Sequence, residues 1–424
     1  MGWWFKIKLW QRVLAALALG LVFGLAMSNT IGQDAATAWI ETYVRPVGDL
    51  FINLIRMLIV PLIFTTLVAG VIAMGKPSKL GSLGLKTIGL YFCTTIVANV
   101  IGLSFGTIFR PGEGANFEGV EPAPVSTEAP SITDRLLEIV PTNPVAALAD
   151  GDVLAIIFFS LLLGVGIIAV GKAGKPVADL FNSASDVVLK ITHYVMEVAP
   201  FGVFALVAYT AASQGLEALQ AIFTLIAAVY IGLIAHAVIT YGFLVRVILN
   251  LPLVRFFRGL TDPIAVAYST ASSSATLPVT IAAASDNLGV KKSVAGSVLP
   301  LGATINMDGT ALYLGILALF TAQAFGYDLT FMNYIMIAFT AAIVSIGAAG
   351  IPSASLFLLA IVLETFGVTP EHTAIIVGFI LPVDRIMDMA RTAVNVTGDA
   401  AVATAVAKWE GELDEERFRD PAVI

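Results

Sequence analysis

Long apolar segments recur along this chain and limit what it can fold into. A helix that crosses a bilayer needs about 20 apolar residues. Six segments in the first half reach that length, near residues 13–30, 47–75, 87–109, 150–171, 183–211 and 219–248. Only 12% of the 424 residues are charged, whereas soluble domains carry about a quarter. The sequence therefore predicts an all-α polytopic membrane protein.

Basic residues in the loops between these segments predict the orientation of the chain. Lysine and arginine are enriched in cytoplasmic loops. They precede the first segment and then recur in alternate loops, at Lys6, Lys8, Arg12, Lys76, Lys79, Lys86, Lys172, Lys175, Arg246, Arg255 and Arg258. The opposite loops carry Asp34, Glu41 and an acidic, proline-rich stretch at 113–128. We therefore expect both termini to be cytoplasmic.

Composition and motifs argue against several other functions. The formal net charge of −7 provides no basic footprint for a nucleic-acid partner. The single cysteine, Cys93, excludes a disulfide framework and a multi-cysteine metal site, and its apolar neighbours predict a small buried hydrophobe. The sequence contains no H-E-x-x-H or G-x-S-x-G motif, so an enzyme is not expected. His193 and His236 are interpreted as packing or interface residues rather than ligands.

Two apolar segments of the second half are interrupted near their centres. The segment at about 264–284 contains the serine-rich stretch 269–278, and the one at about 333–366 contains the Gly/Pro-rich stretch 345–353. Irregular backbone at membrane depth is tolerated only where protein buries it or where it lines a cavity. Small-residue packing or a proline kink would explain either segment alone. The matched pair instead predicts two re-entrant hairpins, near 255–290 and 333–366.

A third interruption lies between these hairpins, in the apolar segment near 293–325. Asn306 and Asp308 stand there next to Gly309. An unwound helix at this point exposes backbone carbonyls beside a carboxylate, and these oxygens are the ligands that hard cations prefer. The sequence therefore predicts a sodium site.

The last apolar segment, about 371–408, carries polar residues on one helix face. Positions 384, 388, 391, 395 and 399 fall within about 80° of one another at 100° per residue. Ionisable groups inside a membrane are costly and mark ion or substrate paths, which favours a function for Asp388, Arg391 and Asp399. For Asp384, an ion pair with Arg385 that only holds the helix is an equal alternative.

The charged residues of the interrupted segments and of the last apolar segment carry an excess of negative charge, which predicts that cations bind there. Four carboxylates, at Asp308, Asp384, Asp388 and Asp399, face only Arg385 and Arg391, which leaves a charge of −2 if all ionise in one dry region. A dicarboxylic amino acid would bring this charge to −3. Burying such an excess uncompensated is prohibitive, so cations must enter or carboxylates must protonate.

Three motifs carry a resemblance to a known family, namely Asn306-Met307-Asp308-Gly309-Thr310, Ser272 to Pro278, and Asp388 to Asp399. With them the chain resembles the dicarboxylate/amino acid:cation symporters, which include the excitatory amino acid transporters and prokaryotic aspartate-transporting relatives. The resemblance covers nearly the whole chain. It implies a homotrimer in a prokaryotic cytoplasmic (inner) membrane. Each protomer would have eight transmembrane helices, two re-entrant hairpins and an elevator mechanism.

The resemblance also implies a division into domains. Residues 1–75 and 120–250 would form mainly the scaffold and trimerisation helices. Residues 76–119 and 251–410 would form mainly the transport domain, and 411–424 a cytoplasmic tail.

The resemblance assigns ligands for co-transported sodium ions. It implies one site at Gly302, Asn306, Asn395 and Asp399, and a second at Tyr91, Thr94, Thr95, Asn306 and Asp308. A third would use backbone oxygens of Thr304, Ser345, Ile346 and Ala348.

The resemblance likewise assigns the substrate site. Arg391 would bind the side-chain carboxylate of an acidic amino acid and Asp388 its α-ammonium, pairings that are chemically sensible in themselves. The other implied contacts are Ser273, Ser274, Thr310, Gly347, Ala349, Gly350, Ile351, Thr392 and Asn395. Arg385 would supply a second cation that relatives carry elsewhere. Leu314 stands where proton-coupled animal members carry a glutamate.

These features together predict sodium-coupled symport of aspartate or glutamate. A C4-dicarboxylate symporter of the same fold is the alternative, and Asp388 argues against it because succinate and malate have no ammonium. A passive channel is a further alternative, which flux without a sodium gradient would identify.

Overall fold

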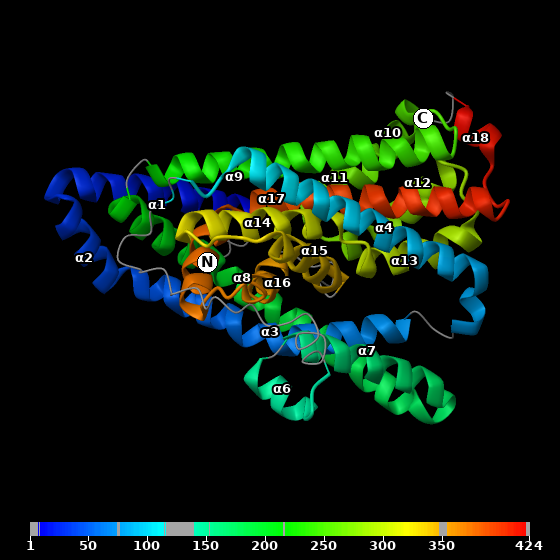
Figure 1. Ribbon diagram of the computed structural model, residues 1–424, viewed down its shortest axis with the longest axis horizontal. Helices are drawn as coiled ribbons and strands as arrows, with labels where there is room; N and C mark the ends of the chain where they lie inside the picture. The colour runs from blue at the N-terminus through cyan, green and yellow to red at the C-terminus, as the bar shows by residue number, and fades with distance from the viewer. Residues whose placement is uncertain are drawn as a thin grey trace.

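The computed structural model describes residues 7, 9–73, 77–113, 115, 140–151, 153–214, 217–346 and 354–420. In these ranges the chain is built of helices, many of which run side by side along the molecule (Figure 1). The described ranges contain no strand, and one isolated antiparallel bridge joins Val290 to Leu413. The predicted all-α class is therefore confirmed for the described residues.

The helices of the first half coincide with the predicted apolar segments. They are α1 Leu9–Ile31, α2 Gln33–Tyr43, α3 Arg45–Ala73, α4 Pro77–Phe109, α6 Pro144–Asp150, α7 Val153–Val170, η2 Gly171–Gly174, α8 Lys175–Gln214, and α9 Glu217–His236, which is followed by the π-helical η3 Ala237–Tyr241 and η4 Leu244–Ile248. The short helices α2 and α6 were not among the predicted segments.

The helices of the second half break where the sequence is interrupted. They are α10 Leu253–Gly259, α11 Thr261–Thr270, α12 Ser273–Asp286, α13 Lys292–Ile305, α14 Asp308–Phe325, α15 Phe331–Ile346, α16 Ala354–Glu364, α17 Pro370–Trp409 and α18 Glu415–Arg419. Of the predicted interruption at 345–353, Ser345 and Ile346 belong to the end of α15, and residues 347–353 lie outside the described residues.

The first interruption forms a helical hairpin. Ala271 ends α11 with a left-handed φ of 52°, and the Ser272 side chain caps α12 by accepting a hydrogen bond from Ala275 N at 3.2 Å. At the open end, the Asn287 amide donates to the Gly259 carbonyl at 2.9 Å. The two arms therefore run antiparallel, as the interruption predicted.

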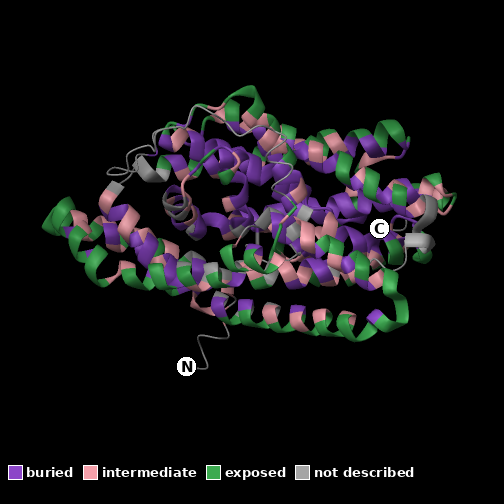
Figure 2. Cartoon of the chain, turned by 60° about the horizontal axis from the view of Figure 1, so that its bottom comes forward, coloured by how far each residue is buried: buried purple, intermediate pink, exposed green. Residues whose placement is uncertain are grey.

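Five stretches of the described residues are long and apolar enough to cross a membrane: Gln11–Ile31, Leu83–Phe109, Phe158–Thr192, Gln220–Ile248 and Lys292–Phe325. Their burial differs widely. In the last of these stretches 89% of the most apolar window is buried, against 18% in the first. Helix α14 is thus a central element, whereas α1 presents its apolar side chains outward. Figure 2 shows the same division between a buried interior and exposed outer faces.

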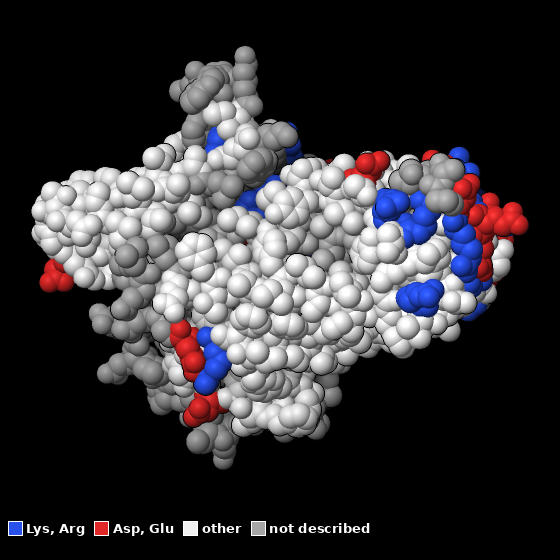
Figure 3. Space-filling model, turned by 90° about the horizontal axis from the view of Figure 1, so that it is seen from above, with Lys and Arg blue, Asp and Glu red and all other residues white. Residues whose placement is uncertain are grey.

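The outer surface is largely uncharged between the two ends of the molecule. Figure 3 shows the charged side chains concentrated at the end where α10 and α18 lie. Exposed apolar side chains cover the outer helices, including Leu19, Val22, Leu162, Val165 and Leu180. Extended exposed apolar surface of this kind fits lipid or another protein better than water.

Cys93 and Glu197 lie in environments that the sequence did not predict. Cys93 is exposed, so the prediction of a buried cysteine was wrong. An apolar run in a membrane protein faces lipid as readily as core, and the sequence does not distinguish the two. The sequence suggested no partner for Glu197 on α8, and the structure pairs it with Arg12 of α1 at 2.7 Å.

Candidate functional site

The break between α13 and α14 places Asn306 among polar groups of α17. The Asn306 side-chain amide donates to the Asn395 carbonyl at 3.1 Å and to Asp399 Oδ1 at 2.9 Å. Its Oδ1 is buried and has no hydrogen-bond partner in the described part of the chain. Buried polar atoms are nearly always paired. The unpaired Asn306 Oδ1 and the neighbouring Asp399 carboxylate are therefore suited to bind a cation.

Two glycines let these groups converge. A Cβ at Gly302 would overlap the Tyr91 hydroxyl and the Asp399 carboxylate. A Cβ at Gly398 would overlap the Tyr241 hydroxyl and the Asn306 amide. The close approach therefore requires glycine at both positions. The residues that the family resemblance assigned to the first sodium site do lie together: Gly302, Asn306, Asn395 and Asp399.

We predict that Gly398→Ala weakens sodium binding about tenfold or more, because the added methyl group displaces the Asn306 amide. The measurement is the sodium concentration that half-saturates substrate binding to purified protein. Gly296→Ala is the matched control, since a Cβ there meets open space. Equal sodium affinity in the two variants would contradict the assignment.

Asp308 lies in a second polar cluster. Thr95 donates to Asp308 Oδ1 at 2.7 Å, and Tyr241 donates to Oδ2 at 2.8 Å. The Thr94 hydroxyl donates to the Tyr91 carbonyl at 3.1 Å, and the same carbonyl lies 2.8 Å from the Thr95 hydroxyl. The residues grouped as the second sodium site therefore also lie together, around the start of α14.

His236 belongs to the same cluster, which the sequence interpretation missed. It is fully buried, and its Nε2 lies 3.2 Å from Asp308 Oδ2. The partner is 72 residues away in sequence, so only the packing of α9 against α14 reveals it. The available signal was a histidine and a tyrosine, Tyr241, in an otherwise apolar segment.

The third predicted sodium set is not assembled by the described contacts. The Thr304 hydroxyl donates to the Leu301 carbonyl at 2.9 Å, and the Ser345 hydroxyl donates to the Ala342 carbonyl at 2.9 Å. Ala348 and the side chain of Ile346 lie outside the described residues. This set stays a prediction.

Arg391 is held by oxygen atoms from two helices. Its Nη2 donates to Asp384 Oδ1 at 3.0 Å and to Asp388 Oδ1 at 2.9 Å, and its Nη1 donates to Ser355 Oγ at 2.5 Å. The guanidinium also lies 3.8 Å from the ring centroid of Tyr313, whose hydroxyl donates to Asp384 at 2.8 Å. Arg391 is only 1% exposed, so it is a fixed buried cation.

These contacts identify the partner of Asp384 as Arg391 rather than Arg385. Asp384 pairs with Arg391 and is fully buried, whereas Arg385 points elsewhere. Arg385 Nη2 donates to the Thr270 carbonyl at the hairpin tip at 3.1 Å, and its Nη1 lies 3.8 Å from Asp388 Oδ2. Arg385 therefore lies between the first hairpin and Asp388, and its role as a second cation stays a prediction.

The other predicted substrate contacts divide into three groups. Thr310, Thr392 and Asn395 are buried near Arg391, with Asn395 Oδ1 accepting from Gly309 N at 2.7 Å. At the hairpin, Ser273 is buried and Ser274 exposed. Outside the described residues lie Gly347, Ala349, Gly350 and Ile351.

The burial assumed in the charge count is present. Asp308, Asp384, Asp388 and Asp399 are each at most 7% exposed. Four buried carboxylates beside one fully buried guanidinium and a partly buried Arg385 form a region that needs further positive charge.

The chain was compared with known protein families. The chain matches the sodium:dicarboxylate symporter family over residues 9–409. It belongs to that family. A member of this family is a transporter, and the apolar helices identify a multi-pass membrane protein.

Three relatives show the range of named substrates in this symporter family. The chain is 37% identical over 414 residues to the proton/sodium-glutamate symport protein of Bacillus subtilis (strain 168), covering 96% of this chain and 94% of that protein. It is 36% identical over 423 residues to the proton/glutamate-aspartate symporter of Escherichia coli (strain K12), covering 97% and 95%. It is 34% identical over 413 residues to the C4-dicarboxylate transport protein of Bacillus subtilis (strain 168), covering 96% and 94%. Identity alone therefore does not choose the substrate.

Proposed function

We propose that this symporter takes up acidic amino acids, aspartate or glutamate, together with sodium. The observation that carries the proposal is the buried pair of Asp388 and Arg391, 2.9 Å apart on one face of α17. An acidic amino acid offers a carboxylate to the guanidinium and an ammonium to the aspartate. Succinate offers no ammonium, and it adds two negative charges to a region already rich in carboxylates.

The polar clusters around Asp399 and Asp308 support sodium as the coupling ion. Both combine a buried carboxylate with neutral oxygens, as a hard cation prefers. The family description and the Bacillus glutamate relative name sodium, whereas the Escherichia relative names the proton. Leu314, at the place of the glutamate in proton-coupled animal members, is fully buried and cannot carry a proton.

We predict that uptake into proteoliposomes falls at least about tenfold without sodium, because an incoming anion then meets the uncompensated carboxylates. Asp399→Asn should weaken sodium binding and, through linkage, substrate binding. Asp262→Asn, which removes an exposed carboxylate from α11, is the control. Uptake driven equally well by a proton gradient alone would replace sodium with the proton.

We also propose the architecture that the family resemblance implies. A homotrimer of protomers with eight transmembrane helices and two re-entrant hairpins would move its transport domain, residues 76–119 and 251–410, past a scaffold of residues 1–75 and 120–250. In support, nearly all the polar contacts of the candidate site come from α4 and α11–α17, with His236 and Tyr241 as exceptions. The outer faces of α1, α7 and α8 carry exposed apolar side chains.

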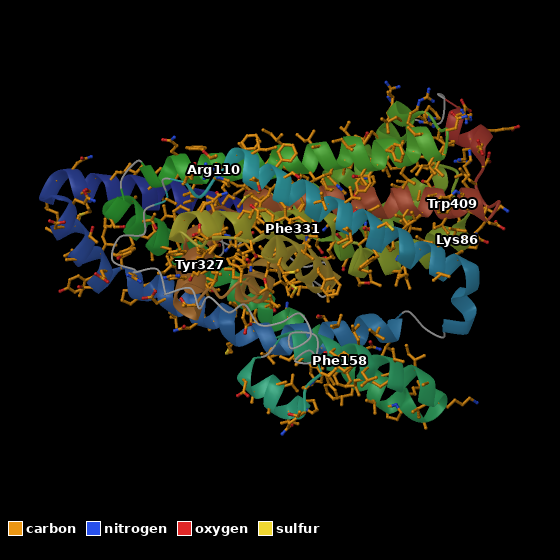
Figure 4. The ribbon with its side chains drawn as sticks, in the orientation of Figure 1. Lys86, Arg110, Phe158, Tyr327, Phe331 and Trp409 are labelled. Atoms are coloured by element: carbon orange, nitrogen blue, oxygen red, sulfur yellow. The ribbon has the colours of Figure 1, made fainter. Side chains whose placement is uncertain are left out.

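The basic residues support a cytoplasmic assignment for one end. Lys86 and Trp409 lie together there, and Arg110 and Tyr327 lie towards the other end (Figure 4). Lys86 pairs with Glu410 at 2.7 Å, which joins the start of α4 to the end of α17. Because positive residues are enriched on the cytoplasmic side, we place the α10 and α18 end in the cytoplasm of a prokaryotic cell. We propose the same side of the membrane for both termini.

A further inference from the structure

The side chain of Arg255 on α10 has no hydrogen-bond partner among the described residues. It is 7% exposed, and its Nε, Nη1 and Nη2 are all buried without a partner in the described part of the chain. A buried charge without a counter-charge is costly, so charged groups inside proteins are paired or bind an ion. The Arg255 guanidinium is therefore suited to bind an anion.

Three lysines at the same end of the molecule form ion pairs. Lys291 pairs with Glu412, Lys408 with Glu415 and Lys86 with Glu410, at 2.6, 2.8 and 2.7 Å. Arg246 on η4 and Arg258 on α10 are exposed. Together with Arg255 they form a group of three arginines, none of which belongs to an ion pair among the described residues.

Exposed apolar side chains alternate with this arginine group along the same segment. Phe243, Val247, Ile248 and Val254 are 55%, 63%, 50% and 72% exposed. Arginines beside exposed apolar side chains are typical of the boundary between the acyl chains and the headgroups of a bilayer. The charged end of the molecule in Figure 3 lies at this boundary if the helices cross the membrane.

We propose that the η4–α10 segment binds the phosphate of an anionic phospholipid, with Arg255 as its central ligand and Arg246 and Arg258 at the rim. Guanidinium binds phosphate in bidentate fashion, and the apolar side chains contact the acyl chains. Arg255 must turn outward to reach the headgroup, and no side-chain hydrogen bond to the described residues opposes that movement. The proposal rests on the cytoplasmic assignment of this end, and it is independent of the transported solute.

Thermal unfolding in nanodiscs tests the proposal. Phosphatidylglycerol, compared with phosphatidylcholine, should raise the unfolding temperature of the unmodified protein by mass action. In Arg255→Met, about tenfold more phosphatidylglycerol should be needed for the same rise. Lys172→Met, which removes an exposed charge from η2 at the same predicted side, should respond like the parent. Arg255→Lys should keep part of the response.

Several results would overturn the lipid site. Equal stabilisation by the two lipids, or an Arg255→Met variant that responds like the parent, would remove it. Stabilisation by inorganic phosphate without phosphatidylglycerol would identify a site for free phosphate instead. Arg255→Met removes only an unpartnered buried cation, so it should fold at least as well as the parent in phosphatidylcholine. Sodium-dependent substrate binding, measured on the same samples, should not change, which separates this proposal from that of the transported solute.

Discussion

Replacing Arg391 by cysteine should abolish uptake of acidic amino acids and favour neutral ones. Arg391 is the fully buried cation of the site, and it holds Asp384, Asp388 and Ser355. Breaking a buried ion pair costs about 3–5 kcal/mol, which corresponds to more than a hundredfold in affinity. A neutral amino acid has no side-chain carboxylate, so it does not lose a pairing with the guanidinium.

Competition assays in proteoliposomes would measure this shift. Labelled aspartate uptake should fall more than about a hundredfold in Arg391→Cys, and labelled serine or cysteine uptake should rise. Arg110→Cys is the control, since the Arg110 side chain is 62% exposed and lies just beyond the end of α4, where it pairs with Glu113. Thermal unfolding would show whether the variant is folded. A folded variant that still takes up aspartate with unchanged affinity would remove Arg391 from the substrate site.

Replacing Asp388 by serine should have a comparably large effect, in the direction of dicarboxylates. The change removes the expected partner of the α-ammonium, and about 3 kcal/mol of lost pairing is more than a hundredfold in affinity. It also leaves Arg391 with Asp384, and Arg385 loses the carboxylate 3.8 Å away. The site then carries less negative charge and should accept a second carboxylate more readily.

The same assays distinguish loss from altered specificity. Asp388→Ser should lose aspartate uptake and gain inhibition by succinate, whereas Asp262→Ser, at an exposed position on α11, should match the parent. If Asp388→Ser keeps the aspartate affinity of the parent, the ammonium is bound elsewhere and the carboxylate has a structural role.

The helices and their interruptions could be predicted because each rests on a local property of the sequence. Length and apolar composition located α1, α3 and α4, and helix-breaking residues located the breaks at Ala271 and Asn306. The shared face of α17 followed from 100° per residue. The pairing of Asp384 with Arg391 follows from the same geometry. Residues seven apart lie almost above one another, whereas Arg385, one residue away, faces another direction.

Contacts between distant segments could not be predicted in this way. Tyr313 and Ser355 contact Arg391, and His236 contacts Asp308, across separations of 36 to 78 residues that only packing determines. The exposure of Cys93 is a related case, because both the core and the lipid are apolar. Periodicity alone does not say which one a side chain faces.

Competition between labelled aspartate and succinate in the unmodified protein tests the proposed substrate most directly. Uptake is measured into proteoliposomes with an inward sodium gradient, and excess unlabelled aspartate, glutamate or succinate is added outside. The buried pair of Asp388 and Arg391 predicts that aspartate or glutamate abolishes the signal, while succinate needs over about a hundredfold more for the same inhibition. Succinate that competes as well as unlabelled aspartate would contradict the account and identify a C4-dicarboxylate symporter.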